Sequence, residues 1–314
     1  MKNIALSSTA TLDSRNSVNL EQLSIRFVQY LDVSEQSVKS YSVGVRKFLS
    51  FLQRNSIVQP TRNTVILYKR EMSEKYAAST VALYLSSIRR FFSWCESEGL
   101  YADITRGVKS PKQTHEHKRD AFSCDELKKI LSGMRRETLE DKRNYAVFAL
   151  IAATGLRTVE VMRADVGDIH SVGGVVMLDV QGKGHAAKDA FVKLSEPVQK
   201  AIAEYLAMRG HVSPNEPLFA SCSRRNKGGR LTTRTISQVC KDAMKAAGYD
   251  SRRLTAHSLR HSAVSIAILQ GMTLDDVSAF ARHSSISITM LYNHTISRMK
   301  SRCESAVSAA IFSA

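Results

Sequence analysis

The sequence predicts a mainly α-helical protein of two domains: an all-α N-terminal domain and an α+β domain with a small antiparallel β-sheet. Two observations support this fold class. Apolar residues recur with a helical period through residues 17–105. Within residues 120–314, two short β-like runs on either side of a glycine-containing turn interrupt the helical pattern. Between the domains, residues 106–119 contain Gly107, Pro111 and several basic residues, which predicts an exposed linker.

Four helices are expected in the N-terminal domain, after a polar N-terminus (residues 1–16) that we expect to be flexible. Their sequences are LEQLSIRFVQYL, SVKSYSVGVRKFLSFLQRN, TVILYKREMSEKY and STVALYLSSIRRFFSWCESEG. Apolar side chains of the first follow the helical period, and the others repeat this pattern with basic residues on the solvent-facing side. Ser79 or Thr80 is the expected N-cap of the fourth helix, and Gly99 is its expected C-terminal stop.

The second domain is expected to begin with a helix in FSCDELKKILSGM, because Ser123 and Glu126 have the spacing of a capping box. NYAVFALIAATG is apolar on nearly all sides, which is typical of a buried central helix. VVMLDV and DAFVKL are the two β-like runs, and QGKGHAAK joins them. Helical patterns return in PVQKAIAEYLAMRG, in TISQVCKDAMKAAG and toward the C-terminus.

The charge balance indicates a polyanionic partner. The chain has 45 Lys and Arg residues against 29 Asp and Glu residues, which gives a net charge of +16 and a pI near 9.8. Nucleic acid is a better candidate for this partner than a membrane surface. A basic soluble protein without such a partner is the alternative.

Several classes of protein lose their usual signatures. No stretch approaches the ~18 consecutive apolar residues of a membrane span, and the N-terminus lacks the apolar core of a signal peptide. The five cysteines form no CxxC pair, as expected of reduced thiols in a cytoplasmic protein. GxxxxGKS/T, HExxH and a GxGxxG after a strand are all missing. HEH at 115–117 and the pair His257 and His261 are weak metal signals, so we expect no metal and no cofactor.

TGLRTVEV, at 154–161, is the first candidate site segment. Gly155 allows a sharp turn after the buried helix, and Arg157 and Glu160 lie three residues apart on one face of the next helix. An arginine next to a buried helix is costly unless it is paired or binds a ligand. The two residues form either a structural ion pair or an arginine that is aimed at an anion and held by the glutamate.

HSLRHSAVSIAILQG, at 257–271, repeats this spacing. Thr255 is the expected N-cap of a helix that is otherwise apolar and ends at Gly271. His257 and Arg260 lie three residues apart in its first turns, where the helix dipole and the unpaired N–H groups favour anions.

Two further segments carry isolated polar side chains. Lys183 lies between glycines in QGKGH; a lysine at such a turn is usually only solvated, but it can also present one ammonium group to a ligand. In ARHSSISITMLYNHT, His283 precedes Tyr292 by nine residues and His294 follows it. Most tyrosines are half-buried packing residues, which is the alternative for this one.

Together these side chains suit phosphodiester chemistry. Arginines bind two non-bridging oxygens of a phosphate and stabilise the charge that builds there during attack. A tyrosine hydroxyl can act as the nucleophile and form a covalent phosphotyrosine, which preserves the phosphoester so that the strand can be rejoined without ATP. A lysine or histidine can supply the proton that the departing sugar oxygen needs.

The ordered segments TGLRTVEV, QGKGH, HSLRH and RHSSISITMLY resemble the tyrosine recombinase family of phage integrases and Xer-like site-specific recombinases. The resemblance covers nearly the whole chain and implies the tyrosine recombinase fold. It makes residues 17–105 the helical core-binding (SAM-like) DNA-binding domain and residues 120–314 the catalytic domain. Arg157 corresponds to the family's first arginine and Glu160 to the acid that usually follows it. Lys183 corresponds to the β-hairpin lysine, the implied general acid for the 5′-hydroxyl.

The same resemblance assigns the other site residues. His257 and Arg260 correspond to the HxxR pair, in which the histidine assists proton transfer and the arginine binds the phosphate. His283 corresponds to the last histidine, which hydrogen-bonds that phosphate. Tyr292 corresponds to the nucleophile, which implies a 3′-phosphotyrosyl intermediate. His294 matches a histidine that is often found just past the tyrosine and has no firm role.

One position departs from the family pattern. Most relatives have glycine just before the last histidine, where this chain has Arg282. Either an ordinary φ suffices at this position, or the arginine adds a phosphate contact. LDDVSAFA is expected to be a short helix with Thr273 and Asp276 as its capping pair, followed by a loop with His283 and a helix with Tyr292.

Basic residues outside the site are predicted to contact DNA phosphates, although solvated loops are the alternative for each cluster. They are Lys109 and Lys112 in the linker, Arg224, Arg225, Lys227 and Arg230 in SCSRRNKGGRLTTRT, and Arg282. By resemblance, the C-terminal stretch SRMKSRCESAVSAAIFSA docks on a neighbouring subunit, and packing within its own subunit is the alternative.

The predicted function is site-specific DNA recombination that integrates, excises or resolves a mobile element. The implied partners are double-stranded DNA with inverted-repeat core sites and further copies of the chain, in a homo-tetramer on two duplexes. Accessory proteins are left open. The alternatives are Xer-like resolution of chromosome or plasmid dimers, a type IB topoisomerase-like enzyme, and a non-catalytic DNA-binding regulator.

Overall fold

A computed structural model describes residues 19–112, 121–182, 187–283 and 285–312, apart from the side chains of residues 295–300. The predicted flexible N-terminus, the second half of the predicted linker and Lys183 lie outside the described residues. The chain divides into two compact units, Met1–Glu116 and His117–Ala314, and each is described by itself. The division falls within the stretch that was predicted to be a linker.

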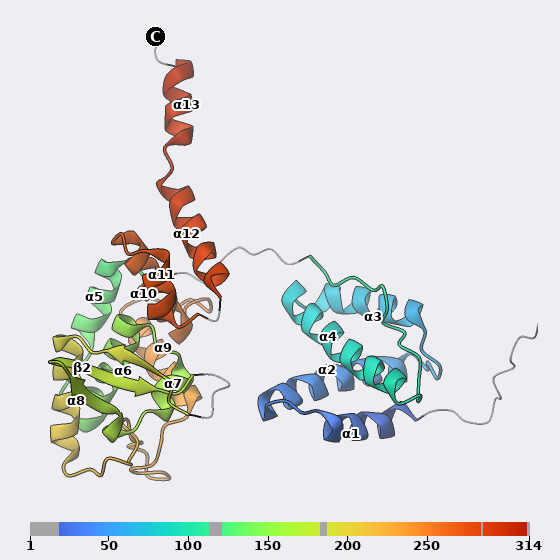
Figure 1. Ribbon diagram of the computed structural model, residues 1–314, viewed down its shortest axis with the longest axis horizontal. Helices are drawn as coiled ribbons and strands as arrows, with labels where there is room; N and C mark the ends of the chain where they lie inside the picture. Colours follow the sequence, from blue (N-terminus) through green and yellow to red (C-terminus); the bar gives the residue numbers. More distant parts are fainter. Residues whose placement is uncertain (1–18, 113–120, 183–186, 284, 313–314) are drawn as a thin grey trace, which may run out of the picture. The chain divides into compact units, whose positions relative to one another are not determined.

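The described part of the first unit contains the four predicted helices (Figure 1): α1 (Leu20–Tyr30), α2 (Glu35–Arg54), α3 (Arg62–Lys75) and α4 (Ala78–Ser97). Their apolar faces share one core, in which the Phe48 ring lies 5.1 Å from that of Tyr68 and 5.9 Å from that of Phe92. Gly44 lets α2 approach α4 closely, because a Cβ at this position would overlap the side chain of Ser87.

The N-terminus of α4 differs from the prediction. Its N-cap is Ala77 and not Ser79 or Thr80. The carbonyl of Ala77 accepts the N–H groups of Thr80 and Val81 at 2.9 and 3.1 Å, so both hydroxyl residues lie inside the first turn. Gly99 ends the helix as predicted, with a φ of +67° that favours glycine.

The start of the predicted linker is held against the first unit rather than exposed throughout. Val108 is buried in the core, and its carbonyl accepts a hydrogen bond from Arg89 at 2.6 Å. The carbonyl of Lys109 accepts one from Lys69 at 3.1 Å. The two donors lie 19 and 40 positions away in the sequence, so local composition gave no sign of these contacts.

The second unit is mainly helical, as predicted, and its helices α6, α8, α9 and α10 pack together (Figure 1). Ala146, Phe148 and Leu150 of α6 are fully buried, which confirms a central helix. The elements in order are α5 (Cys124–Gly133), α6 (Leu139–Thr154), α7 (Thr158–Arg163), a 3-10 turn (Val166–Asp168), β1 (Ile169–Val172), β2 (Val175–Val180), β3 (Ala190–Lys193), α8 (Glu196–Arg209), α9 (Thr233–Ala246), α10 (Ala256–Leu269), α11 (Leu274–Ala281), α12 (Ile286–Lys300) and α13 (Cys303–Phe312).

The β-sheet has three antiparallel strands in the order β1–β2–β3. β2 and β3 are the two predicted runs. β1 was not predicted, because its sequence IHSV is short and half polar. Val172 pairs with Val175, so Gly173 and Gly174 form a two-residue hairpin turn with φ values of +57° and +80°. Two glycines suit the positive φ values of such a turn, so the GG dipeptide was a usable signal.

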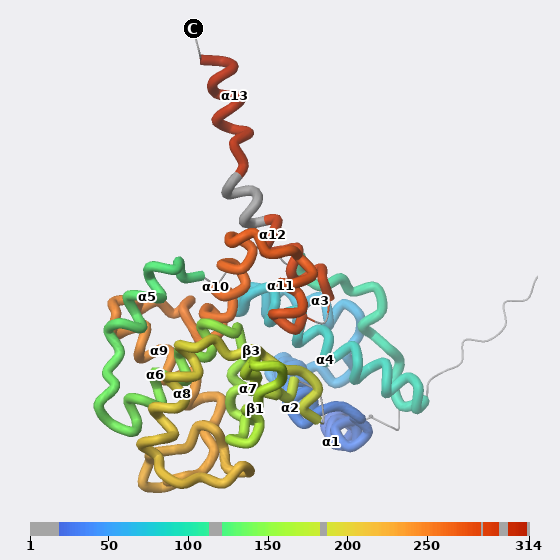
Figure 2. Tube along the Cα trace, turned by 60° about the vertical axis from the view of Figure 1, so that its left-hand side comes forward, coloured from blue at the N-terminus to red at the C-terminus, as the bar shows by residue number. Residues whose placement is uncertain are grey.

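Local capping and a small apolar cluster position the elements of the site. The capping box of Ser123 and Glu126 is confirmed at the start of α5. Helices α10, α11 and α12 lie side by side (Figure 2) and share a hydrophobic cluster made of Val264, Ile268, Val277, Ala281 and Tyr292. Within the described residues, none of the helices is both long enough and apolar enough to cross a membrane.

Candidate active site

Glu160 and Arg157 form the first part of the site, at the turn between α6 and α7. Gly155 ends α6 in the left-handed conformation, with φ +61°, as the sequence predicts. The Arg157 backbone N–H donates to Glu160 Oε2 at 2.7 Å, and its Nη1 donates to Oε1 at 2.9 Å. The ion pair is therefore present, and about a quarter of the Arg157 side chain (27 %) remains exposed for another partner.

Arg260, on α10, ties this turn to the end of α11. Its side chain is buried, and its guanidinium donates to the carbonyl of Gly155 at 2.6 Å and to the carbonyl of Ala281. Burial and, after it, two neighbouring arginines lower the pKa of Arg260 to about 10, against the opposing effects of a carboxylate and Tyr292. The group still carries its charge at neutral pH.

Arg282 does not adopt an ordinary φ, so the first interpretation of this position was wrong. It ends α11 in the left-handed conformation, with φ +52°, and its N–H donates to the carbonyl of Ala279 at 3.0 Å. The next N–H, of His283, donates to the carbonyl of Ser278, and such a helix end is usually closed by glycine. A side chain in this conformation costs roughly 1–2 kcal/mol.

The Arg282 side chain lies inside the site. It is 13 % exposed, and its Nη2 lies 3.2 Å from Glu160 Oε2. Its Nη1 donates to the carbonyl of Phe280 at 2.8 Å, while its buried Nε has no hydrogen-bond partner. A DNA contact by Arg282 stays a prediction, because its charge already faces Glu160.

One buried carboxylate therefore lies among three guanidinium groups. Burial would raise the pKa of Glu160, but the charges of Arg282 and Arg157, with the hydrogen bonds from Arg157, hold it below its ordinary value. Three cations against one anion leave an excess of two positive charges. Such an excess in a partly buried cluster favours binding of an anion.

His283 lies near the three arginines of the cluster, and its ring is uncharged. Its Nδ1 lies 2.8 Å from the hydroxyl of Thr289, and its ring stacks on that of Tyr292, with centroids 6.1 Å apart and planes at 18°. Burial and, after it, the nearby arginines lower the pKa of His283 to about 4. The imidazole is therefore neutral at pH 7 and can hydrogen-bond a phosphate without adding charge.

Tyr292, on α12, reaches this site within its own unit. Its side chain is 6 % exposed and packs in the cluster that joins α10, α11 and α12. Its hydroxyl shares a hydrogen bond with Nδ1 of His261, and the two rings lie 5.3 Å apart. The His257 ring lies 6.3 Å from that of His261. Of the two histidines of α10, His261 therefore contacts the tyrosine and His257 lies beside His261.

The structure thus brings most of the predicted set together, namely Arg157, Glu160, His257, Arg260, His283 and Tyr292. His294 is exposed, and Lys183 lies outside the described residues. Gly182, the last described residue before this lysine, accepts a hydrogen bond at its carbonyl from Arg163 of α7 at 2.9 Å.

Sequence reasoning missed the contact of His261. The second histidine of HSLRH was considered only as a weak metal ligand with His257. Among the described residues, no group of His, Cys, Asp and Glu could hold a metal ion, and HEH at 115–117 lies outside them. Helical spacing alone did not reveal that α12 brings the phenol of Tyr292 to this ring.

The predicted DNA-contacting residues fall into two groups. Arg224, Arg225 and Lys227 are exposed in the loop before α9, and Lys109 and Lys112 are exposed in the first unit. Arg230 instead has partners within the unit, since it donates to the carbonyls of Met162 and Ala164 and pairs with Asp165. A DNA contact by Arg230 stays a prediction, but its guanidinium already holds the loop in place.

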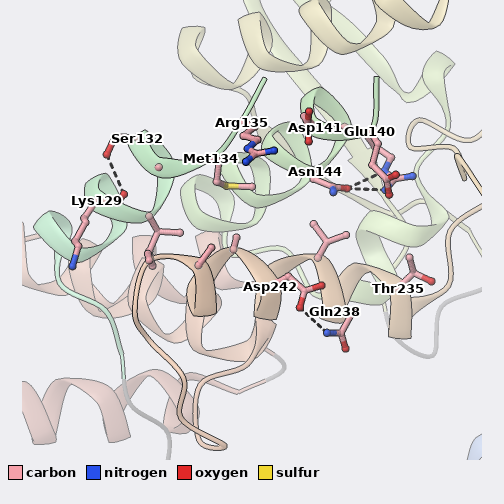
Figure 3. Close-up of a pocket in the computed structure, with 17 residues that line it drawn as sticks. Lys129, Ser132, Met134, Arg135, Glu140, Asp141, Asn144, Thr235, Gln238 and Asp242 are labelled. Carbon is pink, nitrogen blue, oxygen red and sulfur yellow. Dashed lines mark hydrogen bonds and ion pairs between the residues drawn. The ribbon is translucent and has the colours of Figure 1, made fainter. Parts of the chain in front are cut away.

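A separate hollow of about 820 Å³ lies between α5, the start of α6, and α9 (Figure 3). Its lining includes Met134, Glu140, Asn144 and Gln238, and none of the predicted site residues is part of it. The predicted phosphodiester chemistry therefore belongs to the cationic cluster and not to this hollow.

A mainly helical fold of two units, in which a tyrosine lies beside clustered guanidinium and imidazole groups, defines a tyrosine recombinase. Residues 121–298 match the phage integrase family, and residues 25–99 match the SAM-like N-terminal domain of phage integrases. The chain belongs to the phage integrase family.

Relatives and solved structures agree with this membership. Tyrosine recombinase XerC of Herpetosiphon aurantiacus is 28 % identical over 297 residues, which cover 88 % of this chain and 91 % of the relative. Tyrosine recombinase XerA of Pyrococcus furiosus is 26 % identical over 287 residues, which cover 89 % of this chain and 92 % of the relative.

The structure of XerH recombinase bound to palindromic difH substrate matches with a TM-score of 0.74 at 20 % identity, covering 92 % of this chain and 84 % of that one. That of a lambda integrase tetramer bound to a Holliday junction matches with a TM-score of 0.65 at 17 % identity, covering 87 % and 80 %. The predicted fold is confirmed.

Glu160→Gln is expected to lower the free energy of unfolding of the second unit by about 3 kcal/mol or more at pH 7, because two buried cations lose their counter-charge. Urea unfolding followed by circular dichroism measures the loss. The fluorescence of Trp94, the one tryptophan of the chain, reports the first unit and should not change. Since the pKa of Glu160 is lowered, its contribution is full above pH 4.5 and disappears as the pH falls through the lowered value.

The control for this variant is Asp125→Asn. Asp125 pairs with Lys128 at the same three-residue spacing, but both side chains are exposed, so the unfolding midpoint should barely change. Equal losses in the two variants would contradict a structural role for the buried cluster.

His283 should make the stability of the second unit depend on pH. Its pKa is about 4 in the folded chain against an ordinary 6.5, so the unfolded chain takes up a proton first as the pH falls. The free energy of unfolding should therefore be full above pH 6.5 and decline between pH 6.5 and 4. His283→Gln should flatten this slope, whereas His211→Gln, at an exposed histidine of the same unit, should leave it unchanged. The same slope in both variants would show that His283 is not the cause.

Proposed function

We propose that the protein is a site-specific DNA recombinase that cleaves and rejoins DNA strands through a 3′-phosphotyrosyl intermediate. The observation that carries this proposal is the place of Tyr292, whose hydroxyl lies in the same unit as a cluster of three guanidinium groups with excess positive charge. A tyrosine that served only packing would not need a hydrogen-bonded imidazole, a stacked imidazole and a neighbouring guanidinium. Membership of the phage integrase family supports the same function.

The proposed cleavage step uses side chains of this chain. Arg157 and Arg260 hold the non-bridging oxygens of the scissile phosphate, and the charge that builds on them is stabilised by the excess positive charge. Tyr292 Oη forms a bond to phosphorus, and the bond from phosphorus to the 5′-oxygen breaks. By family resemblance Lys183 protonates that oxygen, while neutral His283 hydrogen-bonds the phosphate. Attack by a 5′-hydroxyl on the phosphotyrosine reverses the step and rejoins a strand.

Double-stranded DNA with inverted-repeat core sites is the proposed substrate, and a homo-tetramer on two duplexes is the proposed assembly. Related structures contain such partners: XerH is bound to a palindromic difH substrate, and a lambda integrase tetramer is bound to a Holliday junction. Helix α13 exposes Val307, Ile311 and Phe312, an apolar surface that suits docking on a second copy. Integration, excision or resolution of a mobile element is the proposed outcome. A cytoplasmic location stays a prediction, and accessory proteins stay an open question.

Tyr292→Phe should abolish the covalent protein–DNA adduct. Nicked duplexes that tile the DNA on both sides of the gene serve as probes, because a mobile element carries its recombination site near its recombinase. The nick lets the 5′-end fragment diffuse away and traps the adduct, which appears as a shifted strand in a denaturing gel. The control Tyr249→Phe changes a tyrosine that packs on Phe122 in the same unit and should retain the adduct.

The outcomes of this experiment separate the candidate functions. An adduct that survives Tyr292→Phe, or no adduct with the intact protein on any duplex, would defeat the proposal and favour a DNA-binding regulator. Relaxation of supercoiled plasmid that lacks the flanking DNA would favour a type IB topoisomerase-like enzyme instead.

Neutralising the exposed basic loop should weaken DNA binding in a salt-dependent way. Replacing Arg224, Arg225 and Lys227 together with alanine should make the negative slope of log K against log salt less steep. The magnitude of the slope should decrease by about 0.9 for each phosphate that is no longer neutralised, so by roughly 2–3 in total. Filter binding to duplex between roughly 50 and 200 mM salt measures this slope.

The matched control for the loop removes three positive charges elsewhere in the unit, by alanine at Lys128, Lys129 and Arg135 around the helix α5. These side chains are exposed, so the net charge changes equally. If the magnitude of the slope decreased equally in both triple variants, net charge, and not the loop, would determine the salt dependence of DNA binding.

A further inference from the structure

The contact between His261 and Tyr292 gives the nucleophile a partner that the function proposed above leaves without a role. Nδ1 of His261 shares a hydrogen bond with the hydroxyl of Tyr292. The two rings lie 5.3 Å apart and are tilted by 34°, and the hydrogen bond joins the phenol oxygen to a ring nitrogen. An imidazole nitrogen without a proton accepts such a bond from a phenol.

A phenol needs a proton acceptor before it attacks a phosphate at neutral pH. With an ordinary pKa of about 10, only about one phenol in a thousand is ionised at pH 7. A general base within hydrogen-bond reach takes the proton as the new bond forms, which contributes about 10²–10⁴-fold to such reactions. The required geometry is the one that His261 already has.

We propose that His261 is the proton acceptor that activates Tyr292, an inference that rests on the recombinase function proposed above. As Tyr292 Oη bonds to phosphorus, the phenol proton moves to Nδ1 of His261. The bond from phosphorus to the 5′-oxygen breaks, and that oxygen takes its proton from the general acid. In rejoining, a 5′-hydroxyl attacks the phosphotyrosine and gives its proton back to the deprotonated general acid, while His261 returns its proton to the departing phenolate. Each proton that leaves one group is taken up by another, so the cycle restores the enzyme.

The fold holds this pair in place from one face of α10. His261, Val264 and Ile268 follow one another at three and four residues, so they lie on the same side of the helix. The ring of Tyr292 packs in the cluster that contains Val264 and Ile268, while its hydroxyl lies one turn nearer the helix N-terminus, at His261. Arg260 is the adjacent residue and binds the phosphate in the proposed step. One helix turn therefore presents a cation to the phosphate and a base to the nucleophile.

The neighbouring groups are less suited to accept this proton. His283 stacks on the tyrosine ring, its Nδ1 contacts Thr289, and its pKa of about 4 makes it a weak base. Arg260 is cationic and has no acceptor atom. His257, to which the family resemblance gives a part in proton transfer, is the competing acceptor, and its ring lies 6.3 Å from that of His261. Arg157 and Arg282, which also lower the pKa of His283, are further cations without an acceptor atom.

The test measures single-turnover cleavage of the nicked duplex that yields the adduct, between pH 5 and 9. His261→Asn places an amide oxygen near the position of Nδ1, so it keeps an acceptor for the hydrogen bond but cannot take up the proton. We expect a loss of about 100-fold at pH 7 and a rate that keeps rising toward alkaline pH. The wild-type rate should level off once the pH is high enough to leave the imidazole neutral, and this plateau should be absent in His261→Asn.

A duplex with sulfur in place of the scissile 5′-oxygen separates the base from the acid. A thiolate leaves without protonation, so this probe should rescue Lys183→Ala but not His261→Asn. If this probe restored the cleavage rate of His261→Asn, His261 would act on the leaving group, and the proposal would be wrong. Retention of the plateau in His261→Asn would also overturn the proposal, because it would assign the role of proton acceptor to His257.

Two controls keep the test interpretable. His294→Asn changes an exposed histidine two residues past the tyrosine and should keep both the rate and the pH profile. The unfolding midpoint and the non-covalent DNA affinity of His261→Asn should match those of the wild type, so that a slow rate reports chemistry. A His261→Asn rate within threefold of the wild type, or a faster one, would overturn the proposal. An absence of any adduct with the wild type would instead defeat the recombinase function itself.

Discussion

A buried carboxylate shared by two arginines is the interaction on which the candidate site depends. Glu160 joins Arg157, at the start of α7, to Arg282, at the end of α11, although the two arginines lie 125 residues apart. Arg260 adds bonds from α10 to the carbonyl groups of both neighbouring turns. An ionised carboxylate with 1 % exposure requires such partners. The same partners leave excess positive charge, so structural stability and anion binding come from one cluster.

This arrangement also carries a local cost. Arg282 adopts a positive φ that glycine would accept freely, and its buried Nε has no hydrogen-bond partner. Strain of this kind persists where surrounding contacts determine the conformation, and it concentrates at functional sites. Here the ion pair with Glu160 and the bond to Phe280 offset the cost. Glycine would remove the strain but also one of the three cations.

The basic residues of the chain divide by their partners. Arg230 and Arg163 hold loops of the second unit to its backbone, and Arg89 and Lys69 hold the start of the linker to the first unit. Such side chains have a structural use that net charge does not reveal. Exposed side chains, such as those of the loop before α9, remain available for phosphates. The +16 balance therefore overstates the charge that is free to bind DNA.

The sequence by itself determined the fold class, most of the helices, and the ordered set of Arg157, Glu160, His257, Arg260 and Tyr292. It could do so because helical periodicity is local and because polar residues at fixed spacing mark a chemical family. It did not reveal β1, the start of α4 at Ala77, or the burial of Val108, since short polar strands and tertiary contacts lack a local pattern. Only the tertiary structure decided that Arg282 turns toward Glu160 and that Tyr292 meets His261. Both contacts join segments far apart in the chain, and their geometry depends on how α10, α11 and α12 pack.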